Sequence, residues 1–211
     1  IMYFADEPIA DPAALALYFL SKEASKNLKV VLSGDGADEF FAGYKEYKNR
    51  YYKKIKKYDT LPYKFRNNMA CLFNHKIFGK YQRYFVKHGN LTDINFLRNQ
   101  RFYEFEISRL LKENKKLDVT YVIDTKNLNK TKSVISKMQI NDINIWLAND
   151  ILQKTDKMSM ANSLEVRVPF IDKYVFDVAS SLKDEYKINE KTTKVILRDA
   201  AKKSIPNDSY N

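Results

Sequence analysis

The sequence predicts an α/β protein that is predominantly α-helical, with one or two strands that belong to a parallel sheet. The 211-residue chain has only five Gly and five Pro, which argues against a turn-rich all-β protein. The short apolar run Leu28–Leu32 is typical of a buried strand. A helix predicted over Ala13–Ser25 directly precedes it, with Asp11 as its cap and Pro12 at its first position. Helix followed by strand is half of an αβ repeat, and such repeats build parallel sheets.

Composition restricts the setting of the protein. The single cysteine, Cys71, excludes an internal disulfide framework and fits a reducing compartment. No apolar run reaches membrane-spanning length, and the first residues lack the pattern of a signal peptide. We therefore expect a cytoplasmic protein without a membrane partner.

Residues 45–88 form a basic aromatic helical segment that carries the whole net charge of +11. It holds 13 Lys and Arg against Glu46 and Asp59, and the rest of the chain is neutral. Its Tyr and Phe residues recur at helical spacing, which favours a buried aromatic stripe and a solvated basic face. The alternative is a basic helical module that binds nucleic acid through its cations and rings. No groove-reading motif accompanies the charge, so we do not expect nucleic acid as a partner.

The remaining pattern is mostly helical. Hydrophobic periodicity predicts the longest helix over Ser133–Asn162, followed by an extended stretch around Pro169. On that helix Asp150, Lys154 and Lys157 lie four and three residues apart, so one face carries an acid and two bases, which is also typical of a solvated salt-bridge ladder. Further helices are predicted over Tyr44–Tyr58, Phe96–Lys112, Lys173–Leu182 and Thr192–Lys203.

A glycine-rich acidic turn follows the predicted strand. Gly34 and Gly36 allow positive φ or close approach of the backbone to a ligand, and three carboxylates follow at Asp35, Asp38 and Glu39. Open α/β sheets bind ligands at the carboxyl ends of their strands, and Mg²⁺ uses carboxylate oxygens when it bridges to phosphate. The alternative is an ordinary acidic turn at a helix N-terminus, where the helix dipole favours acids.

Three stretches, residues 6–12, 30–44 and 149–172, together resemble the synthetase domain of the glutamine-dependent asparagine synthetase family. The resemblance implies an ATP-pyrophosphatase-type, adenine nucleotide α-hydrolase-like α/β domain that uses ATP and Mg²⁺. Members adenylate a carboxylate, usually that of aspartate, and ammonia from a separate glutaminase domain then forms the amide. Cyclases and amidotransferases of the same fold act on other carboxylates, which is a further alternative.

The resemblance also implies roles for the acidic turn. Ser33 and Gly34 would line the adenosine part of the ATP site, and Asp38, with Glu39 beside it, would bind Mg²⁺. Asp35 stands where asparagine synthetases place a glutamate near the reacting carbonyl and the ammonia, and it would be catalytic. Its side chain is one methylene shorter, which leaves room for an acceptor other than aspartate.

Two residues of the long helix match positions near the nucleotide pocket, and we expect Asp150 and Lys157 to bind nucleotide. The family's Ser-Gly-Gly-x-Asp-Ser pyrophosphate loop and its glutaminase domain are not in these 211 residues. We therefore expect residues 1–211 to be a partial synthetase domain, cut at both ends and inactive in isolation. A degenerate scaffold without chemistry is a third alternative. So short a piece of sheet would expose an edge and apolar helix faces, and a homodimer is a possible consequence.

Overall fold

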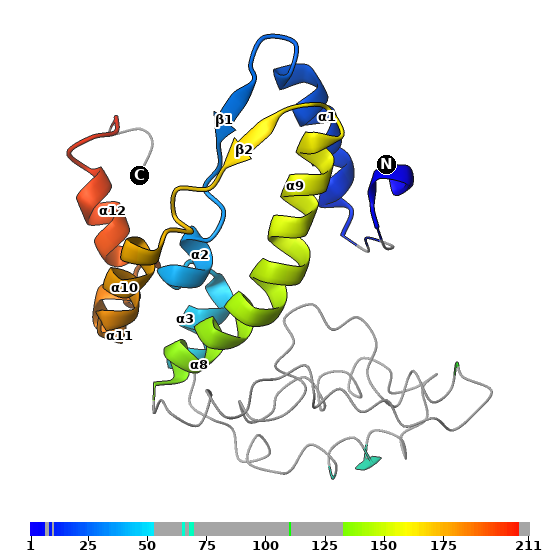
Figure 1. Ribbon diagram of the computed structural model, residues 1–211. Helices are drawn as coiled ribbons and strands as arrows, with labels where there is room; N and C mark the ends of the chain where they lie inside the picture. The colour runs from blue at the N-terminus through cyan, green and yellow to red at the C-terminus, as the bar shows by residue number, and fades with distance from the viewer. Residues whose placement is uncertain are drawn as a thin grey trace. The chain divides into compact units, whose positions relative to one another are not determined.

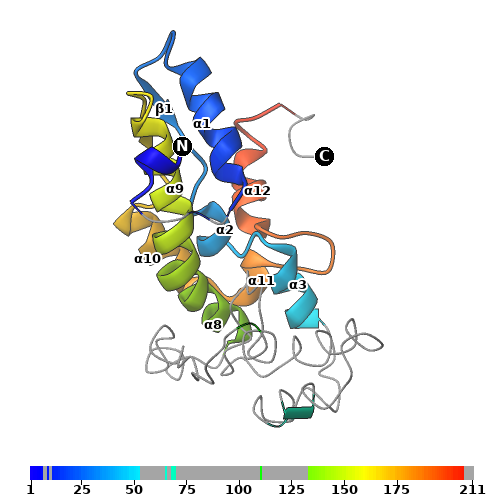
Figure 2. The same cartoon turned by 90° about the vertical axis from the view of Figure 1, so that its right-hand side faces the viewer.

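The computed structural model describes residues 1–6, 9, 11–52, 65, 68, 69, 110 and 133–206 (Figures 1 and 2). For residues 49–52 it describes the backbone alone. The chain divides into two compact units, one made of Ile1–Tyr51 with Asp142–Asn211 and the other of Tyr52–Asn141. Most of the basic segment 45–88 and nearly all of the predicted helix Phe96–Lys112 lie outside the described residues.

A two-stranded parallel sheet joins distant parts of the sequence. Strand β1 (Val30–Leu32) pairs with β2 (Glu165–Arg167), and Val31 lies opposite Val166 (Figure 1). The pairing continues past the strand, because the backbone N–H of Ser33 donates to the carbonyl of Arg167 at 2.8 Å. The predictions of a strand and of a parallel sheet are confirmed, although β1 begins two residues later than predicted. The carboxyl ends of both strands therefore lie at the same edge, where the acidic turn begins. The prediction that the strand is buried is wrong for the described structure, because Leu28, Val30 and Leu32 are exposed.

Helices α1 (Ala13–Ala24) and α9 (Leu152–Met160) lie side by side, and α9 also lies against β2 (Figures 1 and 2). The side-chain amide of Asn162 joins the two helices, because it donates to the carbonyl of Tyr18 at 3.2 Å and to that of Met158 at 3.0 Å. Helix α1 confirms the prediction except at its start. Pro12 precedes the first helical residue instead of occupying it, and Asp11 accepts a hydrogen bond from the backbone N–H of Ala13 at 3.0 Å.

The predicted helix over Ser133–Asn162 is present but is not a regular α-helix throughout. Helix α8 (Val134–Asn141) lies in the second unit, and the π-helical stretch η5 (Asp142–Ile151) runs directly into α9. Periodicity at 3.6 residues could not reveal the π-helical stretch, because its wider turn depends on local packing. Tyr47 donates a hydrogen bond of 2.5 Å to Asp142 at the first residue of this stretch. The buried apolar residues along this stretch are Ile135, Met138, Leu147 and Met158, whereas Ile143 and Ile151 are only partly buried.

Short helices surround the turn. Helix α2 (Ala37–Phe40) follows it directly, and α3 (Lys45–Tyr52) begins after a break, one residue later than the predicted helix. The predicted C-terminal helices appear as α10 (Lys173–Ser181) and α12 (Val195–Ala201), and α11 (Asp184–Lys187) was not predicted. The core beside α2 contains Phe40, Phe41, Leu147 and Ala179.

One face of the sheet and of α1 is apolar and exposed to solvent. Val30 and Leu32 are 41% and 74% exposed, and Leu15, Phe19 and Leu20 of α1 are also exposed. The prediction of exposed apolar surface is therefore confirmed for the described residues, whereas the predicted homodimer remains a prediction. No helix in the described part of the chain is both long and apolar enough to cross a membrane.

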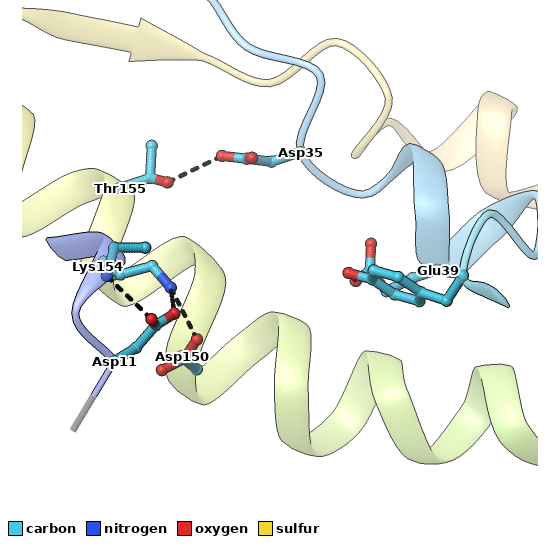
Figure 3. Close-up of polar contacts among 8 residues, drawn as sticks. Asp11, Asp35, Glu39, Asp150, Lys154 and Thr155 are labelled. Atoms are coloured by element: carbon cyan, nitrogen blue, oxygen red, sulfur yellow. Dashed lines mark hydrogen bonds and ion pairs between the residues drawn. The ribbon is translucent and has the colours of Figure 1, made fainter. Parts of the chain in front are cut away.

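A lysine on α9 holds the start of α1 to the end of η5. The ammonium of Lys154 forms ion pairs with Asp11 and with Asp150, the latter at 2.9 Å (Figure 3). It also lies 5.8 Å from the ring centroid of Trp146. Lys154 is only 8% exposed, so the predicted salt bridge at this position exists but is not a solvated ladder. Burial lowers the pKa of Lys154, but the hydrogen bonds that its ammonium donates to both carboxylates raise it by more, so that its pKa lies above the ordinary value.

Replacing this lysine should loosen the start of α1. In Lys154→Met the carboxylates of Asp11 and Asp150 lose their shared cation, and we expect a local destabilisation of about 1–2 kcal/mol. The loss is smaller than for a fully buried pair, because both carboxylate side chains are partly exposed to solvent. Hydrogen exchange of the α1 amides should accelerate by roughly 5–30-fold. The control is Lys26→Met, which removes an exposed ion pair to Glu23 near the other end of α1 and should change exchange by less than about threefold. Equal exchange in both variants would contradict the role of Lys154.

Candidate functional site

The acidic turn runs from the carboxyl end of β1 into α2, as the sequence predicted. Gly36, at the N-cap of α2, has a φ of 87°. Residues with a side chain rarely adopt this backbone conformation. A Cβ added there would also lie 2.6 Å from Cγ1 of Ile171, in the loop that follows β2. The prediction of a positive φ is confirmed at Gly36, and the loop after β2 also leaves little space for a side chain there.

The predicted nucleotide-binding pair precedes this glycine. Ser33 Oγ accepts a long hydrogen bond of 3.4 Å from the backbone N–H of Asp35. A Cβ added at Gly34 would meet no atom within 4 Å, so the surrounding protein does not require glycine at this position. Space beside Gly34 is compatible with a bound ligand, and nucleotide binding by Ser33 and Gly34 remains a prediction.

The three carboxylates of the turn have different partners. Asp35 accepts a hydrogen bond of 2.9 Å from the hydroxyl of Thr155, which is on α9 and only 7% exposed (Figure 3). A neutral hydroxyl orients a carboxylate without cancelling its charge. Of the three acids of the turn, Asp35 is therefore the one held by a neutral group of another helix.

Asp38 faces a cation instead. Its carboxylate forms an ion pair of 3.0 Å with Lys194, the residue before α12, and its side chain is 36% exposed. Gly43 lies against this pair, because a Cβ added there would collide with the Asp38 carboxylate and with Cε of Lys194. Asp38 is thus accessible to solvent but already neutralised within the protein.

Glu39 is buried, and its side chain lies apart from that of Asp35 (Figure 3). It is 1% exposed, and its carboxylate accepts a hydrogen bond from the hydroxyl of Tyr44. Burial raises the pKa of Glu39, and the hydrogen bond from Tyr44 lowers it by less, so that its pKa lies above the ordinary value. The geometry therefore favours Asp38 over Glu39 as a metal ligand, although neither prediction has been tested.

The two predicted nucleotide ligands of the long helix are both in ion pairs. Asp150 pairs with Lys154, as described above, and Lys157 pairs with Asp6 at 2.6 Å. The hydrogen bond to Asp6 raises the pKa of Lys157, whose side chain stays 32% exposed. Asp150 thus has a structural partner, whereas Lys157 remains accessible to a ligand that displaces the exposed Asp6.

Sequence reasoning missed two residues that contact the acids of the turn. Thr155 directly follows Lys154, but a step of one residue places it on a different face of the helix from Asp150, Lys154 and Lys157. Lys194 lies more than 150 residues from Asp38, and no spacing in the sequence relates the two. Only the tertiary structure brings them together.

The described residues fit a Mg²⁺ ion only in part. They contain no group of three or more His, Cys, Asp or Glu side chains that would hold a metal by themselves. Mg²⁺ is, however, commonly bound by one or two carboxylates together with substrate phosphates and water. The exposed carboxylate of Asp38 is a suitable single ligand of this kind, provided that Lys194 gives way.

Comparison with known proteins agrees with the family resemblance of the sequence. A family model described as "Asparagine synthase" matches residues 1–211. Asparagine synthetase (glutamine-hydrolyzing) 1 of Bacillus subtilis is 39% identical over 216 residues, which cover 100% of this chain and 34% of that protein. A putative asparagine synthetase (glutamine-hydrolyzing) of Mycobacterium bovis is 38% identical over 210 residues, covering 98% of this chain and 32% of that protein.

The chain thus spans about a third of the length of the curated relatives it matches. No solved structure matches it significantly. Because the family model covers every residue and the relatives align over nearly the whole chain, the chain belongs to the asparagine synthase family.

Proposed function

We propose that this chain is the part of an ATP-dependent amide-forming ligase that holds one wall of the nucleotide and acceptor site. The acceptor would be the side-chain carboxylate of aspartate or a related acid. The protein would adenylate this carboxylate and transfer ammonia from a glutaminase domain to it. We expect the chain by itself to be inactive, because the proposed site needs a pyrophosphate loop that these residues do not contain.

The observation that carries this proposal is the position of the acidic turn. It leaves the carboxyl end of β1 in a parallel pair, which is where α/β proteins bind nucleotides. Two of its acids also have different partners, since Asp35 accepts a hydrogen bond from the Thr155 hydroxyl and Asp38 pairs with the Lys194 ammonium. An acidic turn that only capped α2 would not require these partners from α9 and from the segment before α12.

The residues would divide the chemistry as follows. Ser33 and Gly34 would contact the adenosine, and Asp38 would hold Mg²⁺, which neutralises phosphate charge when bound. Lys157 would bind phosphate oxygens after release from Asp6. Asp35 would lie beside the acceptor carbonyl, where it orients the incoming ammonia or accepts its proton.

The exposed apolar face supports the idea of a larger domain. Parallel sheets are ordinarily covered on both faces, yet Val30 and Leu32 of β1 are exposed here. We propose that the full-length protein covers this face with further parts of the same domain. A cyclase or amidotransferase of the same family that uses another carboxylate remains the alternative, because nothing described here selects the acceptor.

The metal assignment predicts a large loss of adenylation in the full-length Asp38→Asn variant. The amide cannot supply the negative charge that holds Mg²⁺ against the phosphates, so aspartate-dependent ATP–pyrophosphate exchange should fall by roughly 100-fold. Asp177→Asn, an exposed acid on α10, is the matched control and should keep the wild-type rate. Wild-type exchange in Asp38→Asn would contradict the assignment.

The contact between Thr155 and Asp35 predicts a different kinetic effect. Thr155→Val keeps the shape of the side chain but removes the hydroxyl, so the carboxylate of Asp35 loses its orientation. If Asp35 acts at the ammonia step, amide formation should fall by roughly tenfold, while ATP–pyrophosphate exchange changes by less than about threefold. Both rates are measured on the full-length protein with ammonia as the nitrogen source.

Thr155→Ser provides the control for this prediction, because it restores the hydroxyl and should recover most of the amide-forming rate. An equal fall of both rates in Thr155→Val, without recovery in Thr155→Ser, would indicate that Thr155 only packs α9 against the turn.

A further inference from the structure

The ammonium of Lys194 stands where a divalent cation would bind. Its Nζ lies 3.0 Å from Oδ1 of Asp38, the acid proposed above to hold Mg²⁺. A cation on either oxygen of this carboxylate would lie within a few ångströms of the ammonium, and like charges at that distance repel strongly. If the ammonium of Lys194 stayed in place, its repulsion would therefore weaken the binding of a metal ion to Asp38.

Hydrogen bonds hold the backbone on both sides of the Lys194 side chain, since the carbonyl of Lys194 accepts from the backbone N–H of Arg198 at 2.9 Å. The hydroxyl of the preceding Thr193 donates to the carbonyl of Gly43 at 2.9 Å. Thr193 also forms an antiparallel bridge with Ile188, which is 1% exposed. The backbone N–H of Gly43 in turn donates to the carbonyl of Asp38 at 2.8 Å. A closed ring of contacts thus links Asp38, Gly43, Thr193 and Lys194.

Lys194 also has a costly backbone conformation. Its φ is 53° and its ψ is 39°, in the left-handed region that non-glycine residues adopt rarely. Such a conformation persists only where the surrounding contacts enforce it, and it is frequent at functional sites. The close approach of Gly43 to both charged side chains shows how tightly this position is packed.

We propose that Lys194 is a resident counter-ion of Asp38, which a divalent cation must displace before it can bind. This inference rests on the proposed function, because it takes Asp38 as the metal ligand. The displaced ammonium would remain beside the site, anchored through Thr193, and would be available to the phosphates that accompany the metal. Lys194 would therefore weaken metal binding without nucleotide and favour the metal together with phosphate.

The same arrangement recurs with opposite sign at Lys157. There the exposed carboxylate of Asp6 forms an ion pair with Lys157, which is proposed to bind phosphate. Both proposed ligands of the nucleotide complex are thus neutralised by single, partly exposed partners.

The test is a titration of the nucleotide-free, full-length protein with Mn²⁺, with free metal measured by electron paramagnetic resonance. If Lys194 competes for Asp38, Lys194→Met should bind Mn²⁺ roughly two- to fivefold more tightly than the wild type, as expected from the loss of a partly exposed ion pair. Lys194→Gln should behave in the same way, and Lys194→Arg, which keeps the charge, should bind like the wild type.

Two further variants separate the possible outcomes. Lys191→Met removes an exposed positive charge three residues away and should leave the affinity unchanged, which controls for long-range electrostatics. Asp38→Asn should weaken Mn²⁺ binding by roughly tenfold or more, which verifies the site itself. Tighter binding in Lys194→Met and Lys194→Gln, but not in Lys191→Met, would support the proposal.

If Asp38→Asn weakens binding but neither neutral variant of Lys194 strengthens it, Lys194 is only a structural partner and the inference is wrong. If Asp38→Asn binds Mn²⁺ like the wild type, the metal assignment in the proposed function is wrong as well. The two failures are therefore distinguishable in one set of titrations.

Discussion

The parallel pairing of β1 with β2 is the constraint on which the rest of the described structure depends. It joins segments from opposite ends of the sequence and continues through the hydrogen bond from Ser33 to Arg167. Because both strands end at the same edge, the acidic turn emerges beside the loop that follows β2. A Cβ added at Gly36 would lie 2.6 Å from Cγ1 of Ile171 in that loop, so a side chain there would force Ile171 to shift. The direction in which the turn presents its acids thus follows from backbone pairing.

The charges around the turn are neutralised in two different ways. Lys154 is nearly buried and shares two carboxylates, an arrangement that is costly to break and that suits a permanent structural link. Within the part of the chain that the structure describes, Lys157 and Lys194 each pair with one carboxylate, and their side chains are 32% and 24% exposed. Exposed single pairs contribute little free energy, so a ligand with more charge can replace them. Exposure and number of partners therefore separate structural ion pairs from those available to a ligand.

Much of the fold was predictable because its signals are local. The helix over α1, the strand β1 and the helical character of residues 134–160 follow from hydrophobic periodicity and from turn residues. The π-helical stretch, the break between α2 and α3 and the existence of α11 were not predicted. The π-helical stretch begins at Asp142, which contacts Tyr47 from 95 residues away, and α11 is only four residues long. The site was predictable to the same extent, since Asp35, Asp38 and Glu39 were recognised but their partners were not.

The sequence by itself determined which residues are candidates for the chemistry, because a strand followed by glycines and acids, and the family motifs around it, are encoded in contiguous stretches. The tertiary structure alone decided how the three acids differ. In the folded chain Glu39 is buried and hydrogen-bonded to Tyr44, and Asp35 is hydrogen-bonded to Thr155. Asp38 forms an ion pair with Lys194. The physical reason is that burial and charge pairing depend on which distant segments meet, and the spacing of residues along the chain does not contain that information.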